Sequence, residues 1–467
     1  MIYKSQEELL NNEAIAEENG KIVIKDEKLF REKVIDNIVD TIILGENQDL
    51  KRLAYWIANS CGAQLGVVPS SMQGLYEAMG TKEISGFTVP AMNIRTLTFD
   101  LTRAVFRSAL KINAGAFIFE IAKSEIGYTD QRPVEYTSII TLAALKEGYR
   151  GAIFIQGDHF QVKAATYLKN PEAEINPLKE LIQEAIEANF LNIDIDTSTL
   201  VDLSKSTLEE QQKLNYDLCA SITKTIRQLQ PEGVEISIGG EIGEVGGKNS
   251  TAEELNAFMQ GYIKEIGSLK GISKISIQTG TSHGGVVLPD GSIAKVSIDF
   301  DTLKKLSEIA KTEYKMSGAV QHGASTLPNE AFNRFPDTGC AEIHLATQFQ
   351  NIVYDYLPIP LKEKIYEWLH KECAEEKKAD WTDDQFIYKT RKKALGVFKK
   401  DIHSLSVDAK TKISSVLEEE FSFLFEQLRI KDTKPIVDTH VKVVVVEKSK
   451  AEFLKEERDL GVLEGAD

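Results

Sequence analysis

The sequence predicts an α/β fold, namely a (β/α)8 TIM barrel with added N-terminal and C-terminal helical segments. Two observations lead to this prediction. Short β-branched runs alternate with helix-length amphipathic stretches, and the chain holds eight such runs. Their starts lie roughly 25 to 45 residues apart, the spacing of strand–loop–helix–loop units. Eight alternations within about 270 residues favour a closed barrel over an open doubly wound sheet.

The eight predicted strands are short, apolar and followed by polar turns. In chain order they are FTVPAMNI (87–94), AFIFEIA (116–122), AIFIQ (152–156), FLNIDID (190–196), VEISI (234–238), SKISIQ (273–278), KMSGAVQ (315–321) and CAEIHL (340–345).

Two of the connections carry signals of their own. Thr251 followed by Glu254 matches the capping box, so a helix is expected to begin there. The stretch VVLPDGSIAKVSID from Val286 has an Asp290-Gly291 turn between alternating apolar runs. It predicts a small β-hairpin inserted after the sixth strand, on the face of a barrel where loops carry function.

The chain divides into three predicted segments. Residues 1–80 form an N-terminal helical extension, residues 81–355 form the barrel that carries the chemistry, and residues 356–467 form a C-terminal helical extension. Within the last segment, VKVVVVE from Val441 is expected to form a late strand. The final twenty residues are expected to form a solvated acidic tail.

Composition disfavours several classes of partner. The chain has 55 lysines and arginines against 71 acids, a net charge of −16, so it cannot draw general affinity from nucleic-acid phosphates. No stretch approaches the roughly 18 uncharged apolar residues that span a bilayer, and the N-terminus lacks a signal-peptide core. We therefore expect no nucleic acid, no membrane and a cytoplasmic location. The four scattered cysteines fit that reducing compartment.

Four histidines, His159, His283, His322 and His344, sit at or just beyond the ends of predicted strands. In a barrel these strand ends meet at one mouth. Three of them lie beside glycine in QGDHF, GTSHGG and VQHGAS, so His159, His283 and His322 could converge on one divalent ion. Imidazole suits zinc, cobalt or iron, and three ligands leave a position open for substrate. Any one of these histidines taken alone is more simply a hydrogen-bonded polar residue.

Carboxylates accompany the histidines. Asp158 precedes the first histidine, Asp194 and Asp196 end the fourth strand, and Glu241 and Glu244 follow the fifth in GGEIGEVGG. Facing one cavity, they could complete a metal site or move protons. The two aspartates could equally cap a helix or form a salt bridge, whereas the paired glycines around Glu241 favour a functional role.

The turn HGASTLP from His322 is a candidate phosphate site. Its backbone N–H groups and the hydroxyls of Ser325 and Thr326 could hold a phosphate at the start of a helix expected near Pro328. The chain has no GxxxxGK[ST] loop, and GGEIGEVGG does not match a dinucleotide fingerprint. Nucleotide binding therefore has no support.

These motifs, in this order, resemble the class II, metal-dependent ketose-bisphosphate aldolases, which act on fructose-1,6-bisphosphate or tagatose-1,6-bisphosphate. The resemblance runs from VPAMN at Val89 to Asn351, and its most specific pieces are GDH, EIGEVGG, GTSHG and HGAS. It implies that His159, His283 and His322 hold Zn²⁺ or another divalent transition metal. A monovalent cation is a further candidate cofactor.

The resemblance also implies roles for the residues around the three histidines. It implies proton transfer by Asp158, and it places Glu241 and Asp194 at a neighbouring or alternative metal position. Arg391 is matched to an arginine that reaches into a neighbouring subunit's site. The other residues matched to substrate contacts are Asn93, Gly284, Gly323, Ala324, Ser325, His344 and Thr347.

The chain also departs from the family pattern. Lys248 and Asn249 stand where the family has its general acid/base glutamate, so we look to Glu244 or Glu253, or to a substrate carboxylate or water, as the proton acceptor. The strand-eight NxDT segment appears here as His344-Leu-Ala-Thr. The stretch EIAKSEIGYTDQRP resembles instead the noncatalytic accessory subunit of tagatose-bisphosphate aldolase.

The expected function is reversible, metal-dependent aldol cleavage of a phosphorylated ketose. Fructose-1,6-bisphosphate, giving dihydroxyacetone phosphate and glyceraldehyde 3-phosphate, is the first candidate substrate. Two alternatives stay open: an aldolase for another ketose phosphate such as tagatose-1,6-bisphosphate, and a noncatalytic subunit that stabilises a partner aldolase. The resemblance also implies a homo-oligomer, either a dimer or a tetramer.

Overall fold

The protein is described from a computed structural model that covers most of the chain. The described residues are 1–243, 248–281, 287–288, 294, 297–456, 458–461 and 463. Glu244, His283 and Gly284 lie outside the described residues, and so does the turn predicted at Asp290 and Gly291.

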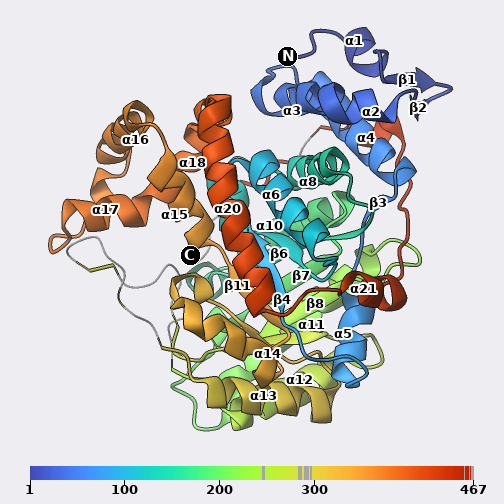
Figure 1. The fold of residues 1–467 in the computed structure, drawn as a ribbon. Coiled ribbons are helices and arrows are strands. Elements are labelled where there is room, and N and C mark those ends of the chain that lie inside the picture. Colours follow the sequence, from blue (N-terminus) through green and yellow to red (C-terminus); the bar gives the residue numbers. More distant parts are fainter. Residues whose placement is uncertain are drawn as a thin grey trace.

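Eight parallel strands close into a barrel at the centre of the molecule (Figure 1). Each strand pairs with the next, and β11 pairs with β4 to complete the ring. The strands are β4 (Val89–Asn93), β5 (Ile118–Ala122), β6 (Gly151–Gln161), β7 (Asn192–Asp196), β8 (Ser237–Glu241), β9 (Lys274–Ile277), β10 (Ala319–Gln321) and β11 (Glu342–Leu345). All eight predicted strands form, and the predicted (β/α)8 barrel is confirmed.

Helices cover the outside of the barrel, which explains why its strands are continuous apolar runs rather than alternating ones. Thr251 caps its helix through the predicted box with Glu254. The helices between the strands are α6 (Thr98–Lys111), α7 (Lys123–Tyr128), α8 (Pro133–Glu147), α9 (Ala164–Tyr167), α10 (Pro171–Glu187), α11 (Leu208–Leu229), α12 (Ala252–Ile266), α13 (Phe300–Tyr314) and α14 (Phe335–Thr338).

The segment before the barrel holds strands as well as the expected helices. β1 and β2 form an antiparallel hairpin, and β3 pairs in parallel with the start of β6, where Val67 lies opposite Gly151. The elements are α1 (Gln6–Leu10), β1 (Ile15–Glu18), β2 (Lys21–Ile24), α2 (Glu27–Leu29), a π-helical turn (Phe30–Val34), α3 (Ile35–Leu44), α4 (Gln48–Gln64), β3 (Val67–Pro69) and α5 (Gln73–Gly80).

The segment after the barrel is helical and packs back onto it. α20 lies along α6 (Figure 1), and the Arg107 Nε is 2.6 Å from the Glu418 carboxylate across that contact. The strand expected from Val441 does not form, because residues 441–449 have no ladder partner. The helices are α15 (Thr347–Tyr356), α16 (Ile359–Glu372), α17 (Asp383–Thr390), α18 (Ala394–Val397), α19 (Lys399–His403), α20 (Val407–Gln427), α21 (Lys434–His440) and α22 (Lys450–Phe453).

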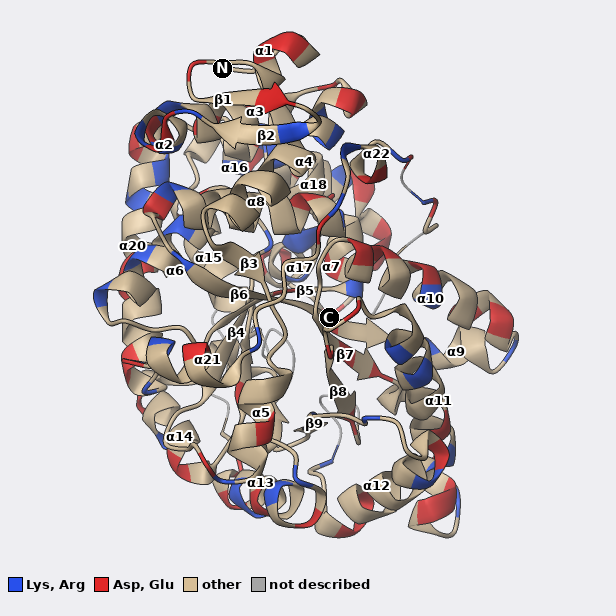
Figure 2. Ribbon diagram, turned by 90° about the vertical axis from the view of Figure 1, so that its right-hand side faces the viewer, with Lys and Arg blue, Asp and Glu red and all other residues tan. Residues whose placement is uncertain are grey.

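Charged residues of both signs mix over the outer helices, as Figure 2 shows. Among the helices in the described part of the chain, none is both long and apolar enough to span a bilayer.

Candidate metal centre and its pocket

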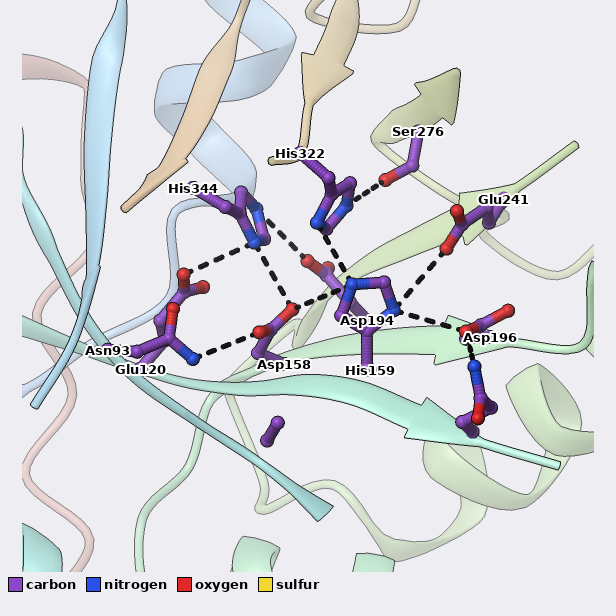
Figure 3. A network of polar contacts seen from close by, with 12 residues as sticks. Asn93, Glu120, Asp158, His159, Asp194, Asp196, Glu241, Ser276, His322 and His344 are labelled. Atoms are coloured by element: carbon purple, nitrogen blue, oxygen red, sulfur yellow. Dashed lines mark hydrogen bonds and ion pairs between the residues drawn. The ribbon is translucent and has the colours of Figure 1, made fainter. Parts of the chain in front are cut away.

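Three histidines meet at the carboxyl ends of the barrel strands (Figure 3). His159 comes from β6, His322 follows β10 directly, and His344 belongs to β11. The ring centroids of His159 and His322 are 4.3 Å apart, and those of His322 and His344 are 4.1 Å apart. Of the three histidines predicted to bind the metal, the structure brings His159 and His322 together, with His344 beside them. The third, His283, lies outside the described residues.

An irregular turn in β6 aims the His159 side chain. The pairing of β6 with β7 shifts register between Gly157 and Phe160, and His159 between them has a left-handed φ of 38°. Bulges and positive φ values of this kind re-aim side chains at functional sites. A Cβ on Gly157 would lie 2.6 Å from the Phe160 ring, so the GDHF sequence needs glycine at its first position.

Asp196 holds the other side of the His159 ring. Its Oδ2 lies 3.1 Å from His159 Nδ1, and Gln161 Nε2 donates to the same oxygen at 2.6 Å. The Ser198 hydroxyl donates to the second carboxylate oxygen at 2.7 Å. Burial alone would raise the pKa of Asp196, but these hydrogen bonds and the charge on His159 lower it below its usual value. An ionised Asp196 only accepts, so His159 Nδ1 donates its hydrogen to it.

The second nitrogen of His159 faces His322. His159 Nε2 and His322 Nδ1 are 3.0 Å apart, and the far nitrogen of His322 lies 2.9 Å from the Ser276 hydroxyl oxygen. When Ser276 accepts a hydrogen from His322 and a metal ion takes the place of the hydrogen on His159 Nε2, both facing nitrogens offer lone pairs to that ion. Nitrogens that are each about 2.0–2.1 Å from zinc lie about 2.9–3.4 Å apart at right-angled to tetrahedral geometry. The observed separation therefore suits two ligands of one ion.

Carboxylate oxygens surround the two histidines. Glu241 Oε2 lies 3.5 Å from His159 Nδ1, and Asp158 Oδ1 lies 3.9 Å from His159 Nε2. Burial and the charges of neighbouring acids raise the pKa of Glu241 well above its usual value. Three buried groups have ligand atoms within 4.8 Å of one another: His159–Glu241–His322, Asp158–His322–His344 and Glu120–Glu342–His344. Mixed imidazole and carboxylate donors suit zinc and similar transition metals, so these residues fit the cofactor that the sequence implied.

His344 links Asp158 to Glu342, an acid of the same strand as His344. Its Nδ1 lies 3.1 Å from Asp158 Oδ1 and 3.2 Å from Glu120 Oε1, and its Nε2 lies 2.7 Å from Glu342 Oε1. Burial alone would lower the pKa of His344, but these acids raise it well above its usual value. For Asp158, burial alone would raise the pKa, but the charges of His159 and His344 hold it well below its usual value.

Asp194 lies deeper in the barrel than Asp196 and has a different partner. Its carboxylate is 3.0 Å from Lys274 Nζ and 3.7 Å from His344 Nε2, and burial raises its pKa to about 6. Lys274 also donates to Glu342 at 2.5 Å. Asp194 is therefore tied into a buried charge network beneath the histidines, whereas Asp196 is the acid of β7 that contacts His159.

A pocket opens above the histidines. Asn93 donates to Asp158 at 3.0 Å and to Glu125 at 2.8 Å, so it holds the aspartate at the pocket floor. The loops after β10 and β11 and the C-terminal segment supply the other walls. The lining residues are Asn93, Arg95, Glu125, Asp158, His159, His322, Gly323, Ser325, His344, Ala346, Thr347, Gln350, Tyr388, Lys389 and Lys392.

The candidate phosphate turn is built differently from the expectation. Ser325 lines the pocket and its Oγ accepts from the Ala346 N–H at 2.8 Å, whereas Ala324 is fully buried and not part of the lining. The helix expected near Pro328 is a pair of 3₁₀ turns, Ala324–Thr326 and Asn329–Arg334, rather than an α-helix. The long-helix N-terminus that would favour an anion is therefore missing at this turn.

Arg391 packs against residues of its own chain and does not line the pocket. Its guanidinium packs over the rings of Tyr354 and Tyr388, at 4.9 Å and 4.5 Å, and it donates to Asn351 at 2.5 Å. The predicted reach into a neighbouring subunit's site does not fit this buried position. Its chain neighbours Lys389 and Lys392 line the pocket instead.

Lys248 and Asn249, at the family's acid/base position, bond to residues outside the pocket lining. Asn249 donates to Asp299 at 3.2 Å, and Lys248 pairs with Glu254 at 2.6 Å. Glu253, considered as a substitute, is exposed at the start of α12. The other glutamate considered, Glu244, lies outside the described residues, and a substrate carboxylate or water stays open as well.

Several site residues were missed by sequence reasoning. Glu120, Lys274 and Glu342 each interrupt an apolar strand run with a charge, and all three are buried in the barrel. A charge inside such a run was the available signal, because buried charges must be paired. The pocket residues Arg95, Lys389 and Lys392 carried no such signal, because they lie in ordinary polar sequence.

The fold and the site together define a barrel protein with a buried histidine–carboxylate centre that opens into a polar pocket. The family model described as fructose-bisphosphate aldolase class-II matches residues 75–412. The chain belongs to the class II fructose-bisphosphate aldolase family, which confirms the resemblance seen in the motifs.

Solved structures that are similar to this chain are distant in sequence. The UxaE fructuronate-tagaturonate epimerase from Cohnella laeviribosi is 13% identical, with a TM-score of 0.50 over 84% of this chain and 86% of that one. The Campylobacter jejuni fructose-bisphosphate aldolase is 17% identical, with a TM-score of 0.47 over 79% of this chain and 97% of that one. The YdjI aldolase from Escherichia coli K12 is 12% identical, with a TM-score of 0.47 over 77% and 97%. At these identities the likeness concerns the fold alone.

Proposed function

We propose that the protein is a metal-dependent aldolase that reversibly cleaves a carbon–carbon bond of a ketose carrying an anionic group. The observation that supports this most is the pair of facing nitrogens on His159 and His322, 3.0 Å apart. Glu241 and His283 complete the proposed ligand set. A divalent ion bound there, zinc first among the candidates, would polarise the substrate carbonyl as a Lewis acid.

Asp158 is the proposed proton acceptor in the cleavage direction. It lines the pocket, it is held by Asn93, and its low pKa keeps it ionised. As the C3–C4 bond of the ketose breaks, the C4 hydroxyl proton moves to Asp158 and an aldehyde leaves. His344, 3.1 Å away, has a raised pKa and is placed to donate a hydrogen bond to the ionised carboxylate.

The second half-reaction needs an acid that protonates the remaining enediolate carbon. We propose Glu244 for this step, because Asn249 cannot donate such a proton and is bonded to Asp299. Fructose-1,6-bisphosphate remains the first substrate to test, followed by tagatose-1,6-bisphosphate.

A second candidate function is epimerisation, and the asparagine at the family's acid/base position favours it. If the enediolate is not protonated, it can attack the aldehyde again. Attack on the opposite aldehyde face re-forms the bond with inverted configuration at C4. The same residues would then interconvert two ketoses without releasing the fragments. The name of UxaE shows that this fold hosts such an activity in another protein.

The test is a coupled cleavage assay on full-length protein before and after chelation and after zinc or cobalt reconstitution. Fructose-1,6-bisphosphate, tagatose-1,6-bisphosphate, a ketose monophosphate and tagaturonate are offered in turn, with product analysis for epimers. We expect a reaction that chelation abolishes and metal restores. His322→Ala should lose it, and His440→Gln on α21, remote from the pocket residues, should keep it. Bound metal without reaction on any ketose would favour the noncatalytic-subunit alternative.

Self-association remains a proposal of its own. A dimer or tetramer is expected by family resemblance, and sedimentation equilibrium of the full chain would decide it.

A further inference from the structure

A second pocket lies between outer helices of the barrel and the C-terminal segment. Its walls come from α4, α8, α10 and α22, and α22 lies beside α4 (Figure 2). This pocket shares no lining residue with the pocket at the histidines. Lys448, which precedes α22, is half-buried and lines the second pocket. Its side-chain amine is therefore separate from the metal centre.

Two acceptors hold the amine of Lys448. Its Nζ donates to the carbonyl oxygen of Glu187, the last residue of α10, and to Asn189 Oδ1 at 2.7 Å. Carbonyls of the last helical turn have no partner within the helix, so this contact caps α10. A neutral amine has two hydrogens and one lone pair. Both hydrogens can satisfy these acceptors, which leaves the lone pair for a molecule in the pocket.

The acids nearest to Lys448 are bound to other groups. The two carboxylate oxygens of Glu187 accept from Arg458 at 2.8 Å and 2.7 Å. The Glu452 carboxylate accepts from the Ser449 N–H at 2.7 Å and from the Ser449 hydroxyl at 2.8 Å. Within the described part of the chain, no carboxylate forms an ion pair with Lys448. The ammonium form of this lysine therefore lacks a direct counter-ion.

Burial without a direct counter-ion favours the neutral amine. It lowers the pKa of Lys448 to about 8, although the charges of Glu452 and Glu187 oppose this. The other charged residues that line the pocket are Arg52, Glu184, Lys455, Glu456 and Arg458. At pH 7.5 about a quarter of a lysine with such a pKa is neutral, against about one part in a thousand of an ordinary lysine. Only the neutral form has the lone pair that makes an amine nucleophilic.

We propose that Lys448 is a modification site, at which an acyl phosphate acylates the side-chain amine. The site stands apart from the reaction proposed at the histidines and does not depend on it. The proposal rests on the two acceptors that match a neutral amine, on the acids that are bound elsewhere, and on the open pocket that the lysine lines.

The acylation balances without a further reactant. The Nζ lone pair attacks the carbonyl carbon of the acyl phosphate, and a C–N bond forms. The C–O bond to phosphate breaks, phosphate leaves with that electron pair, and the nitrogen loses one proton to water. The product amide keeps a single N–H. It can therefore donate to only one of the two acceptors, the Glu187 carbonyl or Asn189 Oδ1.

Acetyl phosphate is the probe that tests the site. Folded, full-length protein is treated with it over a range from about pH 6.5 to 9, and acetylation of each lysine is followed by peptide mass spectrometry. A lower pKa also weakens the neutral amine as a nucleophile, as it does for thiols, so the expected net rate advantage of Lys448 at pH 7.5 is about tenfold. Its rate should level off above about pH 8.

The matched control is Lys455. It lines the same pocket but is exposed, so faster acetylation of Lys448 could not come from better access to the reagent. The same reaction in urea-unfolded protein shows whether the fold is responsible, because both lysines should then react at similar rates. A rate at Lys448 no higher than at Lys455 in folded protein, or an advantage that persists after unfolding, would overturn the proposal.

Discussion

Replacing Asp196 by asparagine tests whether this acid orients the His159 ring toward the proposed metal site. Asp196 accepts hydrogen bonds from His159 Nδ1 at 3.1 Å, from Gln161 at 2.6 Å and from the Ser198 hydroxyl at 2.7 Å. An amide offers one accepting oxygen instead of two and adds two donor hydrogens. Whichever way the amide is turned, its NH2 group faces another donor, either the Ser198 N–H or the pair His159 and Gln161. His159 also loses the anion that holds its Nε2 toward His322.

The size of the effect follows from that geometry. Residues that orient a metal-bound histidine usually contribute 10–100-fold to metal affinity, which is about 1.4–2.8 kcal/mol. We expect Asp196→Asn to weaken zinc binding by about that factor, measured by competition with a chromophoric chelator at constant pH. Asp202→Asn is the control, because Asp202 lies in the following loop and bonds to Ser204. Unchanged zinc affinity in Asp196→Asn would refute the orientation of His159 by this acid.

Three further predictions concern the reaction and the stability of the fold. Glu244→Gln should slow release of the enediolate fragment by at least about 100-fold while cleaved aldehyde still forms, seen as a burst in single-turnover kinetics; an unchanged rate would move the acid elsewhere. The N-terminal amine and His403 hold the pKa of Asp40 at about 2 although burial opposes this, so its stabilising contribution is complete above pH 3.8 and lost as the pH falls toward 2. Asp40→Asn should flatten that part of the urea-unfolding profile, and an equally steep profile would contradict the ion pairs. Phe421→Ala on α20 should cost about 3–5 kcal/mol of unfolding free energy, because this buried ring lies 4.8 Å from the Phe349 ring; a loss below about 1 kcal/mol would show that α20 is not part of the core.

The barrel could be predicted because each strand is marked locally. Runs such as KISI in β9 are β-branched, buried on both faces and bounded by turns, and their number implies closure. The run from Val441 has the same composition but forms no strand. Val444 and Val446 pack against the core without ladder hydrogen bonds, so composition alone did not decide between a strand and an irregular segment.

Only those site residues that lie at strand ends could be predicted from the sequence. His159 and His322 could be placed together because parallel strands end at one mouth. Asp194 and Asp196 could not be told apart, since they share one face of β7 and differ only in depth. Asp196 reaches His159, and Asp194, deeper in the barrel, meets Lys274.

The place of Lys389 and Lys392 in the pocket lining could not be read from the sequence. Lys389 and Lys392 lie about 300 residues beyond Arg95 in a lysine-rich helical stretch, where charge usually marks a solvated face. Their position depends on how Arg391 packs between two tyrosines, which is a tertiary contact with no local signature.

X-ray absorption at the zinc edge of reconstituted, full-length protein tests the central claim most directly. A shared ion on His159 and His322 predicts a nitrogen and oxygen shell at about 2.0–2.1 Å with the outer-shell scattering of at least two imidazoles. His322→Ala should lose one imidazole or the ion itself, and His440→Gln should match the wild type. An oxygen-only shell without imidazole scattering, or a spectrum unchanged in His322→Ala, would contradict the metal centre proposed for this barrel.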